Sequence, residues 1–168
     1  QSLIRQTARR FAEERLLPFA AQWDRDATFP ADTVAELGKL GLLGVTVSPD
    51  WDGVGADYTS LAVALEEIAR GDSGVATVMS GHNCVGCMPV FRYGTEVQKE
   101  TFLQPMARGE MLSSFLLTEP QGGSDASNQK TTARKSGDTY VLNGVKQFIT
   151  SGKSSRIALV FATTAPDL

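Results

Sequence analysis

A change of residue pattern near Gly109 constrains the fold more than any other feature of this sequence. Before it, apolar residues recur at helical spacings of three and four, with charged residues between them. After it, short β-branched and aromatic runs are separated by hairpin connectors such as Asn143-Gly144. Helices followed by strands, without alternation, predict an α+β chain. We expect an all-α domain over residues 1–110 and the start of an antiparallel β domain over residues 111–168.

Three local signals predict where helices begin and end. Pro18 kinks or ends the first helix, because proline lacks the amide hydrogen that a helix interior needs. A second helix follows Pro30 and stops near Gly41. A later helix begins with a capping box, in which Thr95 and Gln98 satisfy each other's free amides.

Apolar spacing predicts which helices are buried. The second helix is expected to turn Val34, Leu37 and Leu40 inward. A third helix is predicted over residues 58–70. A fourth, over about 73–93, has almost no charge and is therefore expected to be covered on most sides. After Gly109, strands are predicted over residues 113–118, 131–135, 139–142, 146–150 and 156–163.

Charge and hydropathy exclude two classes of partner. The chain has 16 Lys and Arg against 19 Asp and Glu, a net charge of −3, and no basic block, so a general nucleic-acid binder is excluded. No apolar run approaches the ~20 residues that cross a bilayer, so no membrane span is predicted.

The chain begins at Gln1 inside a helical pattern and stops at Leu168 soon after a strand-like run. We therefore expect a fragment of a longer fold.

Cys84 and Cys87 form a CxxC pair that admits three interpretations. A zinc site would need two further ligands, and His82 lies too close in sequence to be a third. A thioredoxin-like redox motif would need a βαβ setting that is absent. The favoured interpretation is two small core residues on a buried helix, and the low cysteine count fits a reducing compartment. His82 is also read as structural, since no triad partner is evident.

Most sequence patterns typical of catalytic sites are absent. Gly53-Val54-Gly55 begins like a dinucleotide fingerprint but lacks the third glycine and a preceding βαβ unit. There is no Walker A lysine, no HExxH and no nucleophile elbow.

Two segments have the composition of a cofactor site. In residues 118–125, Thr118 follows a strand and Gly122-Gly123-Ser124 lets backbone amides approach a ligand. In residues 148–152, Phe148 and Thr150 lie two positions apart, on one side of the predicted strand. An aromatic plate, hydroxyls and free amides suit a flat, phosphate-bearing cofactor. Taken singly, each segment also fits an ordinary loop.

Together and in this order, the two segments resemble the acyl-CoA dehydrogenase family of flavoproteins. The resemblance rests on three motifs: Thr118-Glu119-Pro120 with Gly123-Ser124-Asp125, Tyr140-Val141-Leu142-Asn143-Gly144 with Lys146, and Phe148-Ile149-Thr150. Upstream matches such as Leu37-Gly38-Lys39-Leu40-Gly41 and Glu66-Glu67-Ile68-Ala69 extend it over nearly the whole chain.

The resemblance implies an N-terminal helical domain followed by a middle antiparallel β-barrel domain, truncated here, with a second helical domain absent. It implies FAD as cofactor, an acyl-CoA thioester as substrate and a trans-2-enoyl-CoA as product in fatty acid β-oxidation. Electrons would pass to an electron-transfer flavoprotein, and the full-length protein would be a homotetramer or dimer. The expected location is the bacterial cytoplasm, or the mitochondrial matrix in a eukaryote.

The resemblance also implies roles for individual residues. The flavin would be lined by Phe115, Leu116, Leu117, Thr118, Phe148, Ile149 and Thr150. Thr118 would hydrogen-bond the ring, and Thr150 would do so near N5, the hydride acceptor. Gly123 and Ser124 would approach the cofactor phosphates, with Ser124 also near the pantetheine of the substrate. No metal is implied.

The general base, a glutamate, is expected in the absent C-terminal part, so no residue here is assigned to it. Glu119 lies inside the motif, but before a proline at a strand end it is read as structural. By itself the fragment should be inactive and bind FAD weakly or not at all.

The chain departs from the common family pattern at three places. Gln121-Gly122-Gly123 stands where many members have Gly-Ala-Gly, Phe148 where many have Trp, and Asp52-Gly53 where two glycines are usual.

Two alternative functions remain: a flavin oxidase or monooxygenase of the same superfamily, and a non-catalytic module that keeps the fold.

Overall fold

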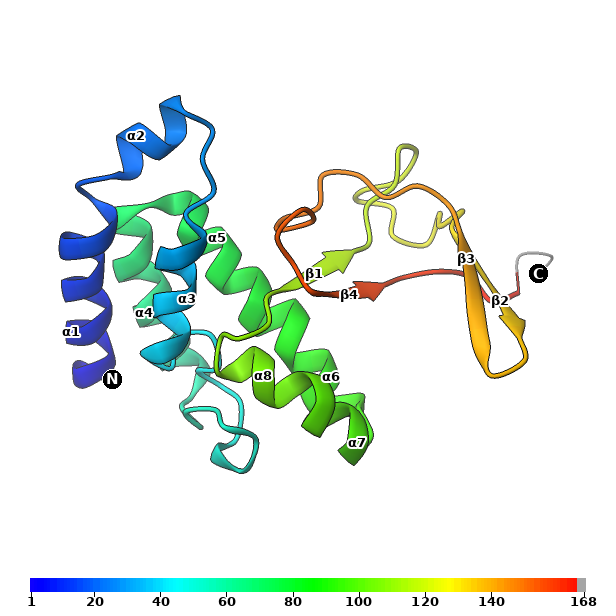
Figure 1. Cartoon of the computed structure of the whole chain (residues 1–168), viewed down its shortest axis with the longest axis horizontal. Helices are drawn as coiled ribbons and strands as arrows, with labels where there is room; N and C mark the ends of the chain where they lie inside the picture. Colours follow the sequence, from blue (N-terminus) through cyan, green and yellow to red (C-terminus); the bar gives the residue numbers. More distant parts are fainter. Residues whose placement is uncertain (166–168) are drawn as a thin grey trace.

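The computed structural model describes residues 1–165. A helical body occupies one side and a strand-containing unit extends from the other (Figure 1). The helical elements are α1 (Ser2–Phe11), η1 (Ala12–Leu16), α2 (Ala20–Arg25), α3 (Ala31–Lys39), η2 (Pro49–Trp51), α4 (Tyr58–Gly71), α5 (Ser73–Gly81), η3 (His82–Cys87), α6 (Met88–Tyr93), α7 (Glu96–Gln98), η4 (Lys99–Leu103) and α8 (Gln104–Ala107). The strands are β1 (Ser113–Leu116), β2 (Thr132–Ser136), β3 (Thr139–Asn143) and β4 (Ile157–Val160).

The predicted helix ends are confirmed. The first helical run ends at Leu16, before Pro18, and α3 follows Pro30. The capping box is present: Thr95 Oγ1 accepts from the Gln98 amide at 3.2 Å, and Gln98 Oε1 accepts from the Thr95 amide at 2.9 Å. These ends are therefore set by local chemistry.

Two clusters of buried side chains form the core of the helical body. The larger one joins α1, α3, α4 and α5 and includes Phe11, Leu37 and Ile68. The smaller one lies around η4 and α8 and includes Cys87 and Leu103. The prediction for α3 is wrong in one detail: Leu40 lies beyond the end of the helix and is 42% exposed, so only Val34 and Leu37 point into the core.

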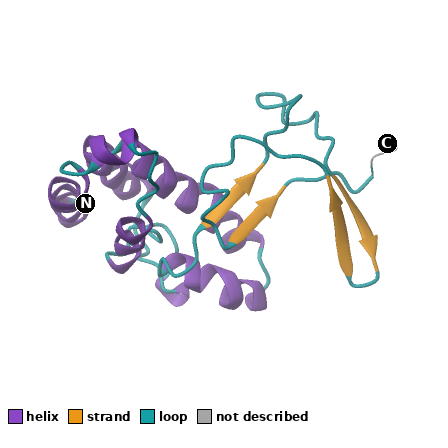
Figure 2. Cartoon of the chain, turned by 45° about the horizontal axis from the view of Figure 1, so that its top comes forward, coloured by secondary structure: helices purple, strands orange, loops and turns teal. Residues whose placement is uncertain are grey.

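The predicted helix over residues 73–93 is a continuous helical run of α5, η3 and α6. Its middle, η3, is π-helical, and there the run passes close to β1. Gly86 makes this approach possible, because a Cβ at that position would overlap Ser113 Oγ. The run is therefore the part of the helical body that packs against β1, and Figure 2 shows strands lying beside the helices.

The strands form two two-stranded sheets within residues 1–165, so the antiparallel arrangement expected from the sequence holds for one pair only. β2 and β3 are an antiparallel hairpin, with Ser136 opposite Thr139. β1 and β4 are parallel, with Ser113 opposite Ile157. The long connection between β1 and β4 lets the chain return and run alongside β1 in the same direction, which a short hairpin cannot do.

The strand predicted over residues 146–150 is wrong: this segment is a loop. Phe148 has a φ of 56° and Ser151 a φ of 60°, outside the range of an extended strand. The Lys146 side chain donates to Leu117 O at 3.0 Å and to Glu119 Oε1 at 2.7 Å, so this loop is held by side-chain contacts.

Candidate functional site

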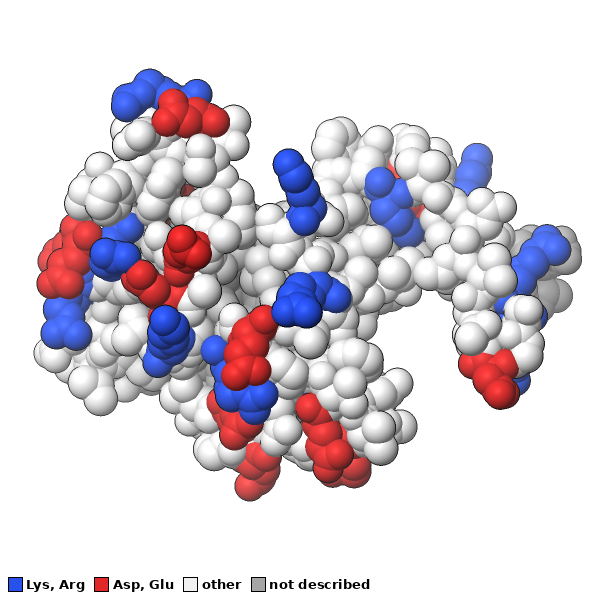
Figure 3. Space-filling model, viewed as in Figure 1, with Lys and Arg blue, Asp and Glu red and all other residues white. Residues whose placement is uncertain are grey.

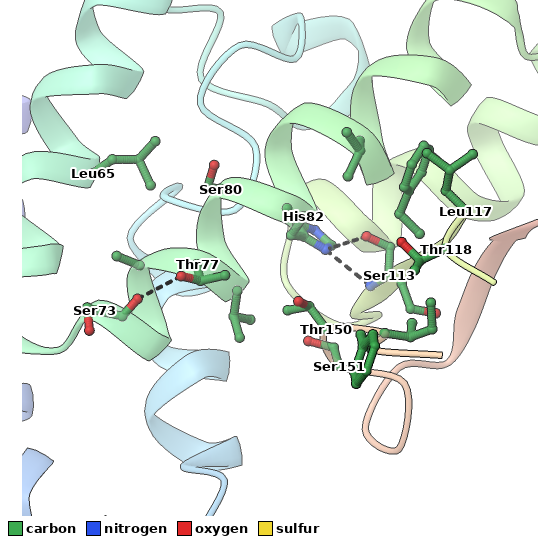
Figure 4. Close-up of a pocket in the computed structure, with 18 of the residues that line it drawn as sticks. Leu65, Ser73, Thr77, Ser80, His82, Ser113, Leu117, Thr118, Thr150 and Ser151 are labelled. Carbon is green, nitrogen blue, oxygen red and sulfur yellow. Dashed lines mark hydrogen bonds between the residues drawn. The ribbon is translucent and has the colours of Figure 1, made fainter. Parts of the chain in front are cut away.

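A groove of about 650 Å³ lies between the helical body and the strand-containing unit. One wall is formed by α4, α5 and η3, and the other by β1 with the loop over residues 148–151 (Figure 4). It is lined by Leu65, Ala69, Ser73, Ala76, Thr77, Val78, Ser80, Gly81, His82, Val85, Ser113, Ser114, Phe115, Leu117, Thr118, Phe148, Ile149, Thr150 and Ser151. The size is in the usual range for a small-molecule site.

The groove brings together the two segments that the sequence singled out. Phe115, Leu117 and Thr118 come from β1 and its end, and residues 148–150 come from the loop opposite. Leu116 points instead to a neighbouring groove of about 480 Å³, because successive strand residues alternate between faces. Gly123 and Ser124 line neither groove; they lie in an exposed loop.

The α5 wall was not predicted from the sequence. Ser73, Thr77 and Ser80 place hydroxyl groups along the groove from successive turns of this helix (Figure 4). Their spacing of four and three residues is that of one helix face. This spacing is visible in the sequence and could have indicated a polar face on an otherwise uncharged helix.

His82 fixes β1 to the helical wall. Its ring is buried, and Nδ1 accepts from the Ser113 amide at 3.2 Å and lies 2.9 Å from Ser113 Oγ. Nε2 lies 3.0 Å from the Met106 carbonyl, so this nitrogen carries the hydrogen and donates it. Burial lowers the pKa of His82. A neutral ring with both nitrogens engaged agrees with the structural role expected for it.

Phe148 presents an unusually open aromatic surface at the edge of the groove. The side chain is 87% exposed and its backbone has a positive φ. Non-glycine residues in that region carry backbone strain, which proteins retain where the surroundings or a ligand require it. A large exposed ring held in a strained loop is a surface on which a planar ligand could stack.

Glu119 and Lys146 form a buried ion pair behind the groove, 2.7 Å apart. The carboxylate also accepts from the amides of Lys130 and Thr131 at 2.7 and 3.0 Å. Lys146 and these donors hold the pKa of Glu119 well below its usual range. A carboxylate so strongly stabilised in its charged form is a poor proton acceptor, which agrees with the structural interpretation of Glu119.

The cysteine prediction is half correct. Cys87 is buried, and burial raises the pKa of its thiol to about 12, so it is not a thiolate at neutral pH. Cys84 is exposed, and it is not the core residue that was expected. Within residues 1–165, no group of three or more His, Cys, Asp or Glu side chains could hold a metal ion.

The chemistry of the groove fits a flavin ring. Phe115, Leu117 and Ile149 supply apolar surface, and the hydroxyls of Thr118 and Thr150 supply hydrogen-bonding groups. A planar ring with polar edges needs both.

On the face seen in Figure 3, acidic and basic side chains are interspersed over the helical body. None of the helices in the described part of the chain has the length and apolar character that crossing a membrane requires.

Comparisons with known proteins match both halves of the chain. The family model of the acyl-CoA dehydrogenase N-terminal domain matches residues 1–110, and that of the middle domain matches residues 114–167. The mitochondrial short-chain specific acyl-CoA dehydrogenase of Rattus norvegicus is 41% identical over 162 residues, which are 96% of this chain and 39% of that protein.

Solved structures match as well. Butyryl-CoA dehydrogenase from Megasphaera elsdenii superimposes with a TM-score of 0.94 at 39% identity, over 98% of this chain and 44% of that one. A glutaryl-CoA dehydrogenase from Mycobacterium smegmatis, in complex with FADH2, gives 0.92 at 35% identity, over 96% of this chain and 42% of that one. The chain thus spans about two fifths of the length of the curated relatives it matches.

Proposed function

The chain belongs to the acyl-CoA dehydrogenase family, and from this premise we propose that it forms the flavin-binding side of an FAD-dependent acyl-CoA dehydrogenase. The reaction is the α,β-dehydrogenation of an acyl-CoA thioester to the trans-2-enoyl-CoA. The domains are residues 1–110, helical, and residues 111–168, the start of a β-barrel domain that further strands would complete.

One observation carries the proposal: a single groove joins Phe115, Leu117 and Thr118 to residues 148–150. These segments are about thirty residues apart in sequence, and both hold the types of residue that a flavin ring needs. The M. smegmatis relative, which has this fold, was solved with FADH2. Convergence in space, similarity of fold and the nature of the side chains thus agree on one cofactor.

Each residue then has a defined task. Thr118 and Thr150 offer hydroxyls to the polar edges of the ring, while Phe148 packs against it. Phe115, Leu117 and Ile149 form the surrounding apolar wall, and Gly123 and Ser124 approach the phosphates, Ser124 also the substrate's pantetheine. When bound, FAD would supply the two-electron acceptor for the hydride that leaves the β-carbon of the thioester.

The base that removes the α-proton is a glutamate outside this chain. Glu119 is engaged by Lys146 and by backbone amides and does not fill that role. The electrons pass to an electron-transfer flavoprotein, and the full-length protein is a homotetramer or dimer. A short acyl chain is the first substrate to test, because the rat relative is specific for short chains.

The test uses the full-length protein. We expect about one FAD per chain, and reduction of an artificial electron acceptor upon addition of butyryl-CoA or a longer acyl-CoA. Appreciable hydrogen peroxide in air would favour an oxidase, and a protein that binds no FAD would refute the proposal.

A pair of variants locates the cofactor. Phe148→Ala should weaken FAD binding by roughly 2- to 12-fold, the range for one aromatic packing contact. Tyr93→Ala is the matched control, since Tyr93 is a similarly exposed aromatic that does not line the groove. Equal FAD affinity in the two variants would argue against a flavin stacked on Phe148.

A further inference from the structure

We propose that Lys146 and Glu119 are positioning residues for the cofactor: their buried ion pair sets the distance and orientation between the two segments that hold the flavin ring. This inference rests on the proposed function. Neither side chain lines the groove itself, so each acts through its neighbours in the chain.

The two charges lie on the segments they would position. Glu119 directly follows Thr118, and Lys146 precedes Phe148 by two residues. Lys146 Nζ also donates to the Leu117 carbonyl at 3.0 Å, and the Gln147 amide donates to the Thr118 carbonyl at 3.0 Å. The contacts of the pair therefore reach the backbone of the residues that line the groove.

All hydrogen-bonding groups of the ammonium are used. Lys146 Nζ has three hydrogens and three oxygen partners: Leu117 O, Glu119 Oε1 and Gln129 Oε1. The Lys146 side chain is 7% exposed and that of Glu119 is 1% exposed. A buried charge with a complete set of partners permits only one arrangement of the segments around it, since any displacement leaves a charge or a polar group unpaired.

The segment that carries Phe148 lacks another regular means of being held. Residues 146–150 are not a strand and form no ladder with β1. Phe148 nevertheless keeps a positive φ, a conformation that persists only where its surroundings determine it. The hydrogen bonds of Lys146 Nζ, two residues earlier, and the bond from the Gln147 amide to the Thr118 carbonyl hold Phe148 in this conformation.

A second buried carboxylate offers a control for general stability. Glu67 is 2% exposed and pairs with Arg9 at 2.8 Å and with Arg70 at 3.0 Å. It holds α1 to α4 in the helical body and does not line the groove. Removing its charge should reduce stability without changing the geometry of the flavin site.

The experiment compares Glu119→Gln, Lys146→Met and Glu67→Gln in the full-length protein. Measurements are the FAD dissociation constant, by titration of apoprotein, and the visible circular dichroism and absorption maxima of bound flavin. Losing one or two well-placed hydrogen bonds to the ring, each worth up to about tenfold in affinity, weakens binding by roughly 10- to 100-fold. We expect FAD binding about 10- to 100-fold weaker and an altered flavin spectrum in the first two variants. Glu67→Gln should retain the wild-type affinity and spectrum despite a lower melting temperature.

The outcomes separate this inference from the proposed function. Wild-type protein without FAD would refute the function. If wild type binds FAD, and Glu119→Gln and Lys146→Met bind it with unchanged affinity and spectrum, the positioning role is overturned and the function stands. If Glu119→Gln and Lys146→Met do not fold, Gln129→Ala tests the positioning role instead, because it removes one acceptor of Lys146 and keeps the ion pair. An altered flavin spectrum in Gln129→Ala supports positioning, and an unchanged one overturns it.

Discussion

Asn83 is the residue whose removal should most directly test how the helical body is held together. Its side chain is 1% exposed and lies in η3. Oδ1 accepts from the Val45 amide at 3.0 Å, and Nδ2 donates to the Leu42 carbonyl at 2.9 Å. These contacts hold the loop after α3, which has no helix or strand ladder of its own at Leu42 and Val45.

The magnitude follows from the two backbone groups. Asn83→Ala leaves the Val45 amide and the Leu42 carbonyl buried without this partner, and each such loss costs about 1–3 kcal/mol. The sum is roughly 2–6 kcal/mol. At about 2–4 °C per kcal/mol for a chain of this size, the melting temperature should fall by roughly 4–24 °C. Urea denaturation followed by far-UV circular dichroism provides the free energy of unfolding directly.

Two further variants make the reasoning refutable. Asn128→Ala is the control, since Asn128 is exposed and should change stability by less than about 0.5 kcal/mol. Asn83→Asp keeps the acceptor for Val45 but turns an oxygen toward the Leu42 carbonyl, so it should be strongly destabilising at neutral pH. If Asn83→Ala unfolds at the same urea concentration as Asn128→Ala, the buried hydrogen bonds do not support the loop as argued.

Three other predictions concern the same helical run. Gly86→Ala should destabilise the protein by about 1–3 kcal/mol, because the added Cβ would overlap Ser113 Oγ. Gly81→Ala is the control: it has open space around it and should be neutral or stabilising by up to about 1 kcal/mol. Equal melting temperatures of the two variants would contradict the close approach of η3 to β1. Stability should fall as the pH drops below about 6.5, because burial lowers the pKa of His82 in the folded protein and the unfolded chain then binds more protons. That part of the pH dependence should disappear from denaturation curves of His82→Asn, and its persistence would assign it to other groups. A thiol reagent at pH 8 should label the exposed Cys84 and leave the buried Cys87 unmodified in native protein, and labelling of native Cys84→Ser at the wild-type rate would refute this.

Much of the helical half could be predicted because its signals are local. The Thr95–Gln98 capping box and the helix end before Pro18 depend only on residues a few positions apart. The exposure of Leu40 could not be predicted in this way, since its spacing matches that of Val34 and Leu37. It is exposed because the helix ends at Lys39, and the periodicity no longer applies beyond that point.

The site was predicted in parts and assembled by the tertiary structure. Thr118, Phe148 and Thr150 were identified from their residue types and order, and the structure places them in one groove. The loop over residues 146–150 was mistaken for a strand because its residue types favour β structure. In the structure the backbone of Phe148 has a positive φ, and Lys146 bonds to residues 17 to 29 positions away, contacts that the local sequence does not reveal.

By itself, the sequence determined the order of helices and strands, several helix ends and the family motifs, all of which depend on near neighbours along the chain. The tertiary structure alone decided that β1 and β4 run parallel, that η3 approaches β1 at Gly86 and that the hydroxyls of α5 face residues 148–151. Contacts between distant segments depend on how whole surfaces pack and on which buried charges find partners. No local pattern of residues encodes that result.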